Sequence, residues 1–315
     1  MFSLIKNEMV KIFAKKANWI YILILILAVV IGGIIQQKIY GEPSDNWREE
    51  TQTELNQLKK DLEAAPNEDK EWIMEQIQQK QRYLDENINP NAVSNWHFMN
   101  GTVIGMTMLV TLFAVIVSSA SVSSEFAEGT IKQLLIRPHQ RWVILLSKYI
   151  SVLIYSIVLL IVLIISGYIV GLILFGSGDF NAKIFETTLD GQQKLAVVGT
   201  QFFLKVMYYI PSLLIIMTIA FMLSTLFKSQ ALAVGIGIFV LFLSSTIGGV
   251  IVLLAEKYTW TKFLIFPHLD LTVYALQEKI LQDVTLPMSL IILAVYYIIF
   301  LLITFTFFQK RDISI

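Results

Sequence analysis

Cysteine is absent from the 315-residue chain, and histidine occurs only three times. The missing cysteine excludes disulfide bonds, thiolate metal sites, iron–sulfur clusters and cysteine nucleophiles. His97, His139 and His268 stand far apart in the sequence, so none of them forms a closely spaced pair of metal ligands. The sequence therefore presents no pattern typical of a metal or redox site.

Charged residues are also scarce. They make up 15% of the chain, whereas hydrophobic residues make up 56% and the mean hydropathy is +0.66. Soluble proteins carry about 25% charged residues, so much of this surface must face something other than water. The 24 basic and 24 acidic residues cancel, which argues against a nucleic-acid-binding protein.

The motifs of common enzymes are missing as well. The chain has no phosphate-binding Gly-x-x-x-x-Gly-Lys loop and no His-Glu-x-x-His zinc motif. Several serines gather near residues 118–124, but His97 and His268 are expected at the opposite membrane face, and His139 is expected outside the bilayer core. We therefore expect no catalytic residue, cofactor or metal in this chain.

Six apolar stretches are long enough to cross a bilayer, whose core of about 30 Å needs about 20 helical residues. They are rich in Ile, Leu, Val and Phe and longer than the strands of a membrane barrel, so helices are favoured. The first lacks an Ala-x-Ala-like cleavage site and is interpreted as a retained anchor. The predicted fold is an all-α integral membrane protein with spans at residues 19–35, 101–122, 149–175, 206–227, 231–254 and 288–308.

The basic residues predict the orientation, because cytoplasmic loops are enriched in Lys and Arg. With both termini in the cytoplasm, the inner segments hold 11 basic and 4 acidic residues, and the outer segments hold 13 basic and 20 acidic residues. This polarity favours cytoplasmic termini. The inner segments are 1–18, 123–148, 228–230 and 309–315, and the outer segments are 36–100, 175–205 and 255–287.

Two of these polar segments are predicted to be helical. Residues 2–16 place apolar side chains at helical spacing, which suits an amphipathic helix in the cytoplasmic interface, or a plain extension of the first span. The outer segment 36–100 shows similar spacing on both sides of a proline. It predicts two helices, at about 46–64 and 68–87, folded as an extracellular antiparallel hairpin.

Small residues mark helix faces that can approach closely. Gly101-x-x-x-Gly105 and Gly167-x-x-x-Gly171 have the spacing that brings two helix backbones together. Packing within one bundle is one interpretation of these pairs, and a seam between two copies of the chain is the other.

The inner loop at residues 123–148 is the most informative segment. It is too polar to span the membrane, yet it carries an apolar cluster in its middle. Gly129 permits a sharp turn, Thr130 can cap a short helix and Pro138 ends it. Such a helix suits docking into a groove on a cytoplasmic partner, or lies in the interface without a partner. The expected contact residues are Glu125, Glu128, Gly129, Thr130, Ile131, Leu134, Leu135 and Pro138.

The pattern Glu-x-x-Glu-Gly-Thr-x-x-x-Leu-Leu-x-x-Pro at residues 125–138 resembles the signature of bacterial type-2 ABC exporter permeases. The start Asn7-Glu8-x-x-Lys11, the turn Phe227-Lys228-Ser229 and the ending Phe308-x-x-Arg311-Asp312 are similar to the same family. The resemblance implies an interfacial N-terminal helix, a coupling helix in the loop, and a separate ATPase subunit that holds ATP and Mg. It also implies two permease copies, as a homodimer or heterodimer. The outer hairpin is longer than in many members.

We therefore expect a permease subunit in the bacterial plasma membrane that exports a hydrophobic or amphipathic compound, such as a drug, a peptide antibiotic or a lipid-linked molecule. Its partners would be the cytoplasmic ATPase, a second permease copy and the lipid bilayer, with no nucleic acid. One alternative is a membrane-anchored sensor or scaffold whose outer hairpin binds a ligand or a protein. A carrier driven by an ion gradient is disfavoured, because no span carries a charged residue in its interior.

Overall fold

The chain folds into a bundle of long helices. The structure is a computed structural model, and it describes residues 1–40, 46–131, 139–189, 191–255, 257–281 and 283–311. It confirms a mostly helical chain with six helices that are long and apolar enough to span a membrane. They are α2 (Lys16–Tyr40), α6 (Thr107–Ala127), α8 (Arg141–Phe175), α9 (Val198–Leu226), α10 (Gln230–Ala255) and α11 (Leu286–Lys310).

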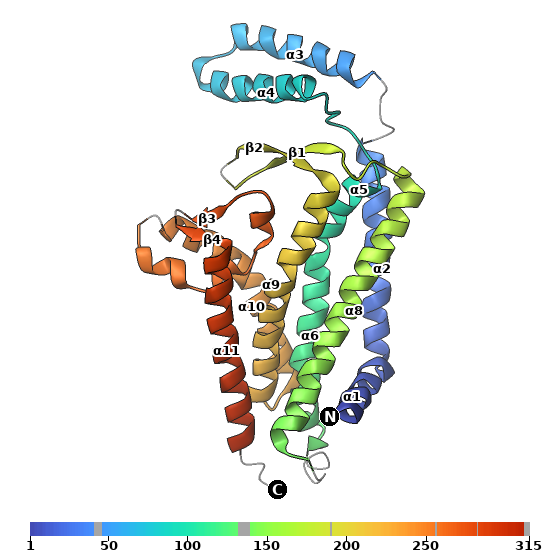
Figure 1. The fold of residues 1–315 in the computed structure, drawn as a ribbon, viewed down its shortest axis with the longest axis vertical. Coiled ribbons are helices and arrows are strands. Elements are labelled where there is room, and N and C mark those ends of the chain that lie inside the picture. Colours follow the sequence, from blue (N-terminus) through green and yellow to red (C-terminus); the bar gives the residue numbers. More distant parts are fainter. Residues whose placement is uncertain (41–45, 132–138, 190, 256, 282, 312–315) are drawn as a thin grey trace.

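Helices α6 and α9 form the centre of the bundle (Figure 1). Helix α6 packs against α8, α9 and α10, while α2 lies against α8 and α11 lies against α9. The most apolar stretch of α6 is 61% buried, whereas those of α2, α10 and α11 are only 22%, 19% and 17% buried. The outer helices therefore expose apolar faces that require lipid as their solvent.

Several helices extend beyond the apolar stretches from which they were predicted. Helix α8 has 35 residues, so it is about 50 Å long and exceeds a bilayer core of about 30 Å. Helix α6 is preceded by a short helix, α5 (Asn95–Phe98), and by a π-helical turn, η1 (Met99–Val103). The predicted second span at residues 101–122 therefore begins inside this turn. Pro211 lies within α9 and does not end that helix.

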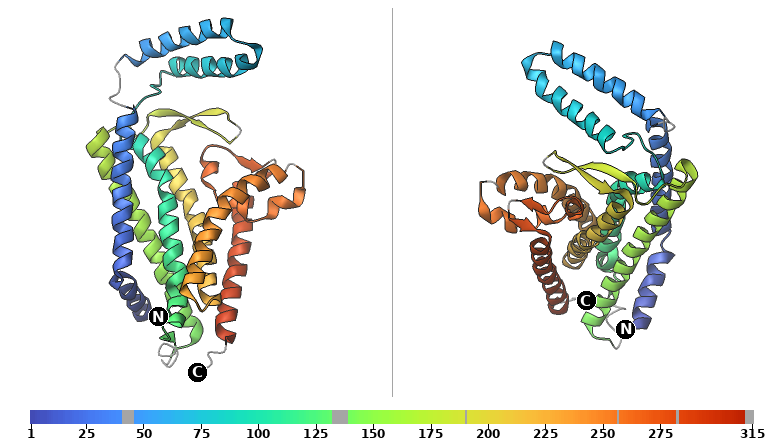
Figure 2. Two further views of the ribbon diagram at one scale, coloured as in Figure 1. Left: turned by 180° about the vertical axis from the view of Figure 1, so that it is seen from behind. Right: turned by 45° about the horizontal axis from the view of Figure 1, so that its top comes forward.

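Helix α1 (Phe2–Ala14) lies at the end of the bundle where α11 also ends, and we call this the α1 end (Figure 2). The chain turns sharply between α1 and α2 at Lys15, which has an extended backbone. Asn18 donates a hydrogen bond to the carbonyl of Ile12, and the Trp19 indole donates one to the carbonyl of Phe13. These bonds satisfy carbonyl groups that the end of a helix leaves without partners, so the bend is held by the residues that follow it.

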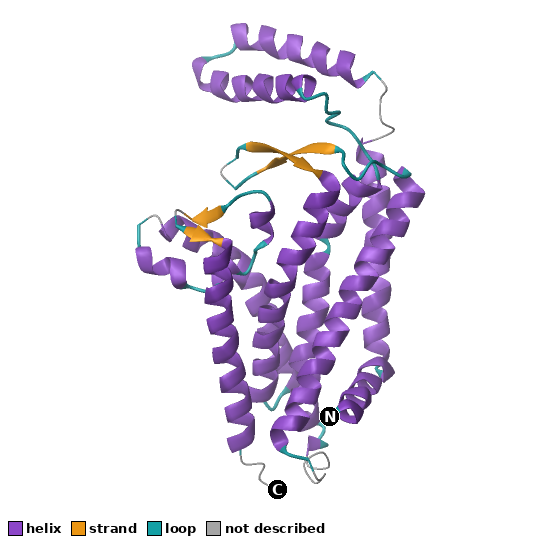
Figure 3. Cartoon of the chain, viewed as in Figure 1, coloured by secondary structure: helices purple, strands orange, loops and turns teal. Residues whose placement is uncertain are grey.

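The opposite end, which we call the hairpin end, carries the α3–α4 hairpin and the strands (Figure 3). Helices α3 (Trp47–Ala64) and α4 (Asn67–Asp85) form an antiparallel hairpin above the strand pair β1 (Lys183–Thr187) and β2 (Gln193–Val197). The rings of Tyr83 and Phe185 pack edge to face with their centroids 5.1 Å apart, and this contact joins α4 to β1. The remaining elements are η2 (Thr259–Phe263), η3 (Phe266–His268), η4 (Thr272–Ala275), β3 (Lys279–Leu281) and β4 (Val284–Thr285).

The two glycine pairs differ in their surroundings. A Cβ atom added at Gly167 would lie 2.7 Å from a methyl group of Val103, and one at Gly171 would lie 3.2 Å from the Cα atom of Asn95. These two glycines let α8 pack closely on α5 and η1 within the bundle. Around Gly101 and Gly105 an added Cβ atom would meet no described atom within 4 Å, so this face of η1 and α6 is open in the single chain.

This difference predicts the effects of two matched substitutions. Gly167→Leu should lower the free energy of unfolding by about 1–3 kcal/mol, because it overpacks a closed contact. Gly105→Leu should leave the stability of the single chain unchanged. Thermal unfolding of each purified variant measures its stability, and size-exclusion chromatography before heating verifies that the variant is folded. Equal destabilisation by the two substitutions would contradict the assignment of Gly105 to an open face.

Candidate functional site

Four charged side chains from three helices meet at the α1 end, and we call them the charge cluster. Glu8 and Lys11 come from α1, Glu125 from the last turn of α6 and Lys148 from the start of α8. The Lys148 Nζ atom lies 2.6 Å from Glu125 Oε1 and 2.8 Å from Glu8 Oε2. The Lys11 Nζ atom lies 2.8 Å from Glu8 Oε1 and 3.1 Å from Glu125 Oε1. Each ammonium group therefore bridges both carboxylates.

Three of the four side chains are largely removed from water, whereas that of Lys11 is 44% exposed. The side chain of Lys148 is 1% exposed, and those of Glu8 and Glu125 are 12% and 11% exposed. A charge at this depth is tolerated only when it is paired, because removing it from water is costly. Oε2 of Glu125 is buried without a hydrogen-bond partner among the described residues. The cluster thus ties α1, α6 and α8 together through interactions that leave little freedom to separate them.

The pKa shifts of Glu8 and Lys11, both on α1, favour the charged forms of these two side chains. Burial alone would raise the pKa of Glu8, but the ammonium groups of Lys148 and Lys11 outweigh it, so this pKa lies below its usual value. Burial alone would lower the pKa of Lys11, but the carboxylates of Glu8 and Glu125 outweigh it, so this pKa lies above its usual value. Both side chains therefore remain ionised around neutral pH.

A pocket of about 540 Å³ lies beside the charge cluster, between α1, α2, α6 and α8. Its charged lining residues are those of the charge cluster together with Lys15 and Glu128. Its apolar and aromatic lining residues include Ile12, Tyr21 and Ile116. The pocket thus combines balanced charge with an apolar wall at the level where α1 meets the bundle.

The structure describes five of the predicted contact residues and places them differently. Glu125 lies inside the bundle as part of α6, which continues to Ala127, so the loop begins later than residue 123. Glu128, Gly129 and Thr130 are exposed after α6, and Gly129 has a φ of +72° that favours glycine. Ile131 is buried, with 3% exposure. Leu134, Leu135 and Pro138 lie outside the described residues.

The end of α11 reaches the same region through Arg311. Its guanidinium group lies 4.2 Å from the ring centre of Phe126 in α6 and donates a hydrogen bond to the carbonyl of Thr225 in α9. Arg141, at the start of α8, donates to the carbonyl of Arg311. The start of the chain, the end of α6 and the end of α11, which are far apart in sequence, thus converge at the α1 end.

The serine–histidine contact at His268 has a structural explanation. His268 is fully buried, its Nδ1 atom lies 2.8 Å from Ser289 Oγ, and its Nε2 atom lies 2.8 Å from the carbonyl of Lys262. Both ring nitrogens are occupied, and burial lowers the pKa of His268, so the ring anchors η3 to α11. In the part of the chain that the structure describes, no three His, Asp or Glu side chains are grouped to hold a metal.

Lys148 is the member of the charge cluster that sequence reasoning missed. It directly precedes the predicted third span, where a lysine is typical of an anchor at the membrane interface. The structure instead directs it inward. Glu8 and Lys11 were singled out only as part of a sequence pattern, and their pairing with Glu125 could not be read from that pattern.

Comparisons with known proteins place the chain among membrane proteins. It is 36% identical over 321 residues to "Uncharacterized protein YhcI" of Bacillus subtilis (strain 168), a match that covers all of both chains. It is 30% identical over 211 residues to "Uncharacterized membrane protein YdbK" of the same organism, covering 67% of this chain and 80% of that protein. No solved structure matches the chain significantly.

The name of the second relative agrees with the six apolar helices, and the chain is a multi-pass membrane protein. A family model described as "Protein of unknown function (DUF2705)" matches residues 71–314. This match covers most of the chain, from within α4 to beyond the end of α11. The chain therefore belongs to the DUF2705 family.

Proposed function

We propose that this chain is the permease subunit of an ATP-driven ABC exporter in a bacterial plasma membrane. Two such permeases would line the transport path, and a separate cytoplasmic ATPase subunit would bind ATP and Mg. The α1 end would face the cytoplasm, as the excess of basic residues in its segments favours. The cargo would be a hydrophobic or amphipathic compound.

The charge cluster is the observation that carries this proposal. It joins α1, the end of α6 and the start of α8, and the segment between α6 and α8 is the one that resembles a coupling helix. A push on that segment by an ATPase would reach three helices at once, because separating them would leave charges buried without partners. The bundle would then respond as a unit rather than by local bending of one loop.

An experiment with the complete transporter tests the proposal. The chain is co-expressed with a candidate ABC ATPase subunit, and the two are purified together and reconstituted into vesicles. Export of a membrane-active peptide antibiotic is then measured with and without ATP. Export should require ATP and should stop when the phosphate-loop lysine of the ATPase is replaced by alanine. Export that continues with this inactive ATPase, and stops when ion gradients are collapsed, would instead identify a gradient-driven carrier.

The alternative of a sensor or scaffold has support from the outer hairpin. Trp72 and Met74 of α4 are 61% and 51% exposed, and exposed apolar side chains of this size often mark a contact with another molecule. A sensor would not need the ATPase. If cells that lack the ATPase gene respond to the peptide antibiotic as unchanged cells do, this second function would be favoured.

A further inference from the structure

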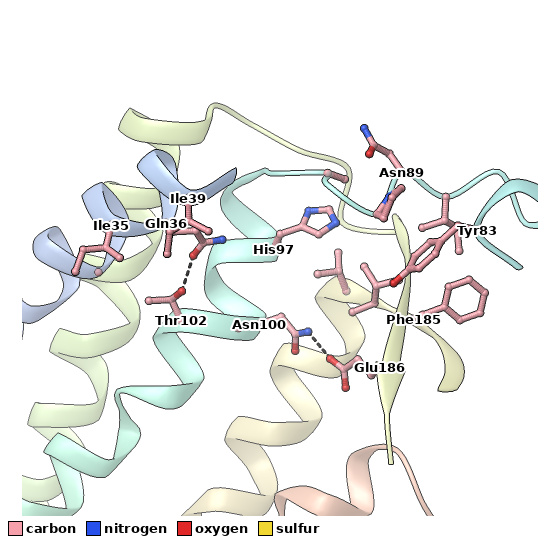
Figure 4. Close-up of a pocket in the computed structure, with 17 residues that line it drawn as sticks. Ile35, Gln36, Ile39, Tyr83, Asn89, His97, Asn100, Thr102, Phe185 and Glu186 are labelled. Atoms are coloured by element: carbon pink, nitrogen blue, oxygen red, sulfur yellow. Dashed lines mark hydrogen bonds between the residues drawn. The ribbon is translucent and has the colours of Figure 1, made fainter. Parts of the chain in front are cut away.

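A second pocket, of about 530 Å³, lies at the hairpin end (Figure 4). It is enclosed by the end of α2, the connector that follows α4, the π-helical turn η1 and strand β1. The charge cluster lies at the other end of the bundle, so the two sites are separate. The apolar wall of this second pocket includes Ile35, Ile39, Ile88, Ile184, Phe185 and Val198.

Asn100 lines this pocket from η1, and its amide has an unsatisfied acceptor. Its side-chain amide donates a hydrogen bond to Glu186 Oε1 (Figure 4), and the residue is only 7% exposed. Because a carboxylate can only accept, the NH₂ group must face Glu186 and the amide oxygen must face away from it. That oxygen, Oδ1, is buried and has no partner within the described part of the chain. Turns of the π type often occur at functional sites.

Glu186 gives the pocket a second acceptor group. It lies on β1, and the Lys205 Nζ atom of α9 is 2.7 Å from the same Oε1 atom that Asn100 contacts. The side chain of Glu186 is 15% exposed and that of Lys205 is 18% exposed. An ionised carboxylate offers about four acceptor positions on its two oxygens, so these two donors leave capacity for another.

The other polar groups of the pocket add no positive charge. His97 is neutral at physiological pH, because burial lowers its pKa, and its Nδ1 atom lies 2.7 Å from Ser94 Oγ. Above the pocket, residues 46–87 of the α3–α4 hairpin carry 11 acidic and 6 basic residues. Such a surface attracts cations toward the pocket.

We propose that this pocket binds an amphipathic primary amine. The ammonium group would donate a hydrogen bond to the Glu186 carboxylate, and the apolar body would lie against the isoleucine side chains. Asn100 Oδ1 is covered in the unliganded chain, so a small shift of the Asn100 side chain would expose it as the second acceptor. An ammonium group has three donors and no acceptor, so it complements a site that holds an unpaired acceptor and a carboxylate. This inference goes beyond the proposed transport function, because the site needs neither ATP nor the ATPase.

Binding to the full-length chain in lipid nanodiscs tests this proposal without any nucleotide or partner. The probe is monodansylcadaverine, a fluorescent primary amine, and the control probe is its N-acetyl derivative, with empty nanodiscs as background. The amine should bind at least about tenfold more tightly than the acetylated probe. Asn100→Leu and Glu186→Gln should each weaken binding by about tenfold, which corresponds to one lost charged hydrogen bond.

Gln201→Leu is the matched control variant. Gln201 is also 7% exposed, donates one hydrogen bond to the carbonyl of Ala275 and has a buried oxygen without a described partner, but it does not line the pocket. This variant should bind the amine as the unchanged chain does. Size-exclusion chromatography verifies folding, and Glu186→Gln decides the outcome if Asn100→Leu does not fold. Equal affinity for both probes, or unchanged affinity in the folded pocket variants, would overturn the proposal.

A third probe distinguishes two sources of the ammonium group. A dansyl-labelled Leu-Lys amide presents it on a peptide, and monodansylcadaverine presents it on a simple alkyl chain. Tighter binding of the peptide would identify a cationic peptide as the ligand, and tighter binding of the alkylamine would identify a small amphipathic amine. Because the ATPase is absent from this assay, its outcome is independent of the test of transport.

Discussion

Replacing Lys148 by methionine is expected to lower the free energy of unfolding by about 3 kcal/mol and to abolish transport. Methionine fills a similar volume but leaves Glu8 and Glu125 without the ammonium group that lies 2.8 Å and 2.6 Å from them. Removing one partner from a buried ion pair costs about 3–5 kcal/mol. The lower value applies here because Lys11 still contacts both carboxylates. Unfolding of the purified chain in mixed detergent micelles measures the loss.

Two further variants show whether this loss comes from the buried charge. Lys183→Met removes an ion pair with Glu86 in which both side chains are about half exposed, and such pairs contribute about 0–1 kcal/mol. The double variant Lys148→Met with Glu125→Gln should recover part of the stability, because it removes a carboxylate left without its partner. Equal stability of Lys148→Met and Lys183→Met would show that the charge cluster does not hold the helices together.

Replacing both Leu134 and Leu135 by aspartate is expected to reduce recovery of the ATPase partner by at least about tenfold. These leucines belong to the apolar cluster of the predicted coupling helix, Ile131, Leu134, Leu135 and Ile136. Ile131 is buried, so the substitutions are made at the two leucines. Two carboxylates placed in an apolar docking groove would lose their hydration without gaining partners, which is unfavourable by several kcal/mol. Affinity purification of the tagged permease, with the ATPase quantified on a gel, gives the ratio of the two subunits.

The matched control for this experiment is Leu189→Asp. Leu189 is 62% exposed in the turn between β1 and β2, at the hairpin end. It should leave the subunit ratio unchanged, since an exposed position tolerates the charge. An unchanged ratio and unchanged ATP-dependent export in the double leucine variant would refute the assignment of the coupling helix.

The helices could be predicted well from the sequence, and their ends could not. Lipid-facing helices leave long apolar runs, so the six stretches stand out from the polar segments. Helix α8 begins at Arg141, before the predicted span at residues 149–175, because backbone hydrogen bonds can continue a helix beyond the stretch that the bilayer requires to be apolar. The α3–α4 hairpin was predictable from its helical spacing and from Pro66, which precedes α4.

The two pockets were beyond prediction for a different reason. The charge cluster joins residues up to 140 positions apart, and nothing local in the sequence distinguishes Lys148 from an interfacial lysine. At the hairpin end, Asn100 and Glu186 are 86 positions apart, and the π-helical turn that aims Asn100 has no sequence signal. Contacts of this kind depend on how helices pack, whereas apolar periodicity reports only which face of each helix is covered.

The charge cluster has one more property that follows from its composition. It is built from two lysines and two glutamates, so the formal charges of the four side chains sum to zero. Moving one elementary charge through the membrane potential involves about 2.3 kcal/mol for each 100 mV. Because the four groups are bound to one another, a shift of this end of the bundle along the membrane normal would move no net charge with them. The membrane voltage therefore exerts no net force on the cluster, and its position is decided by contacts alone.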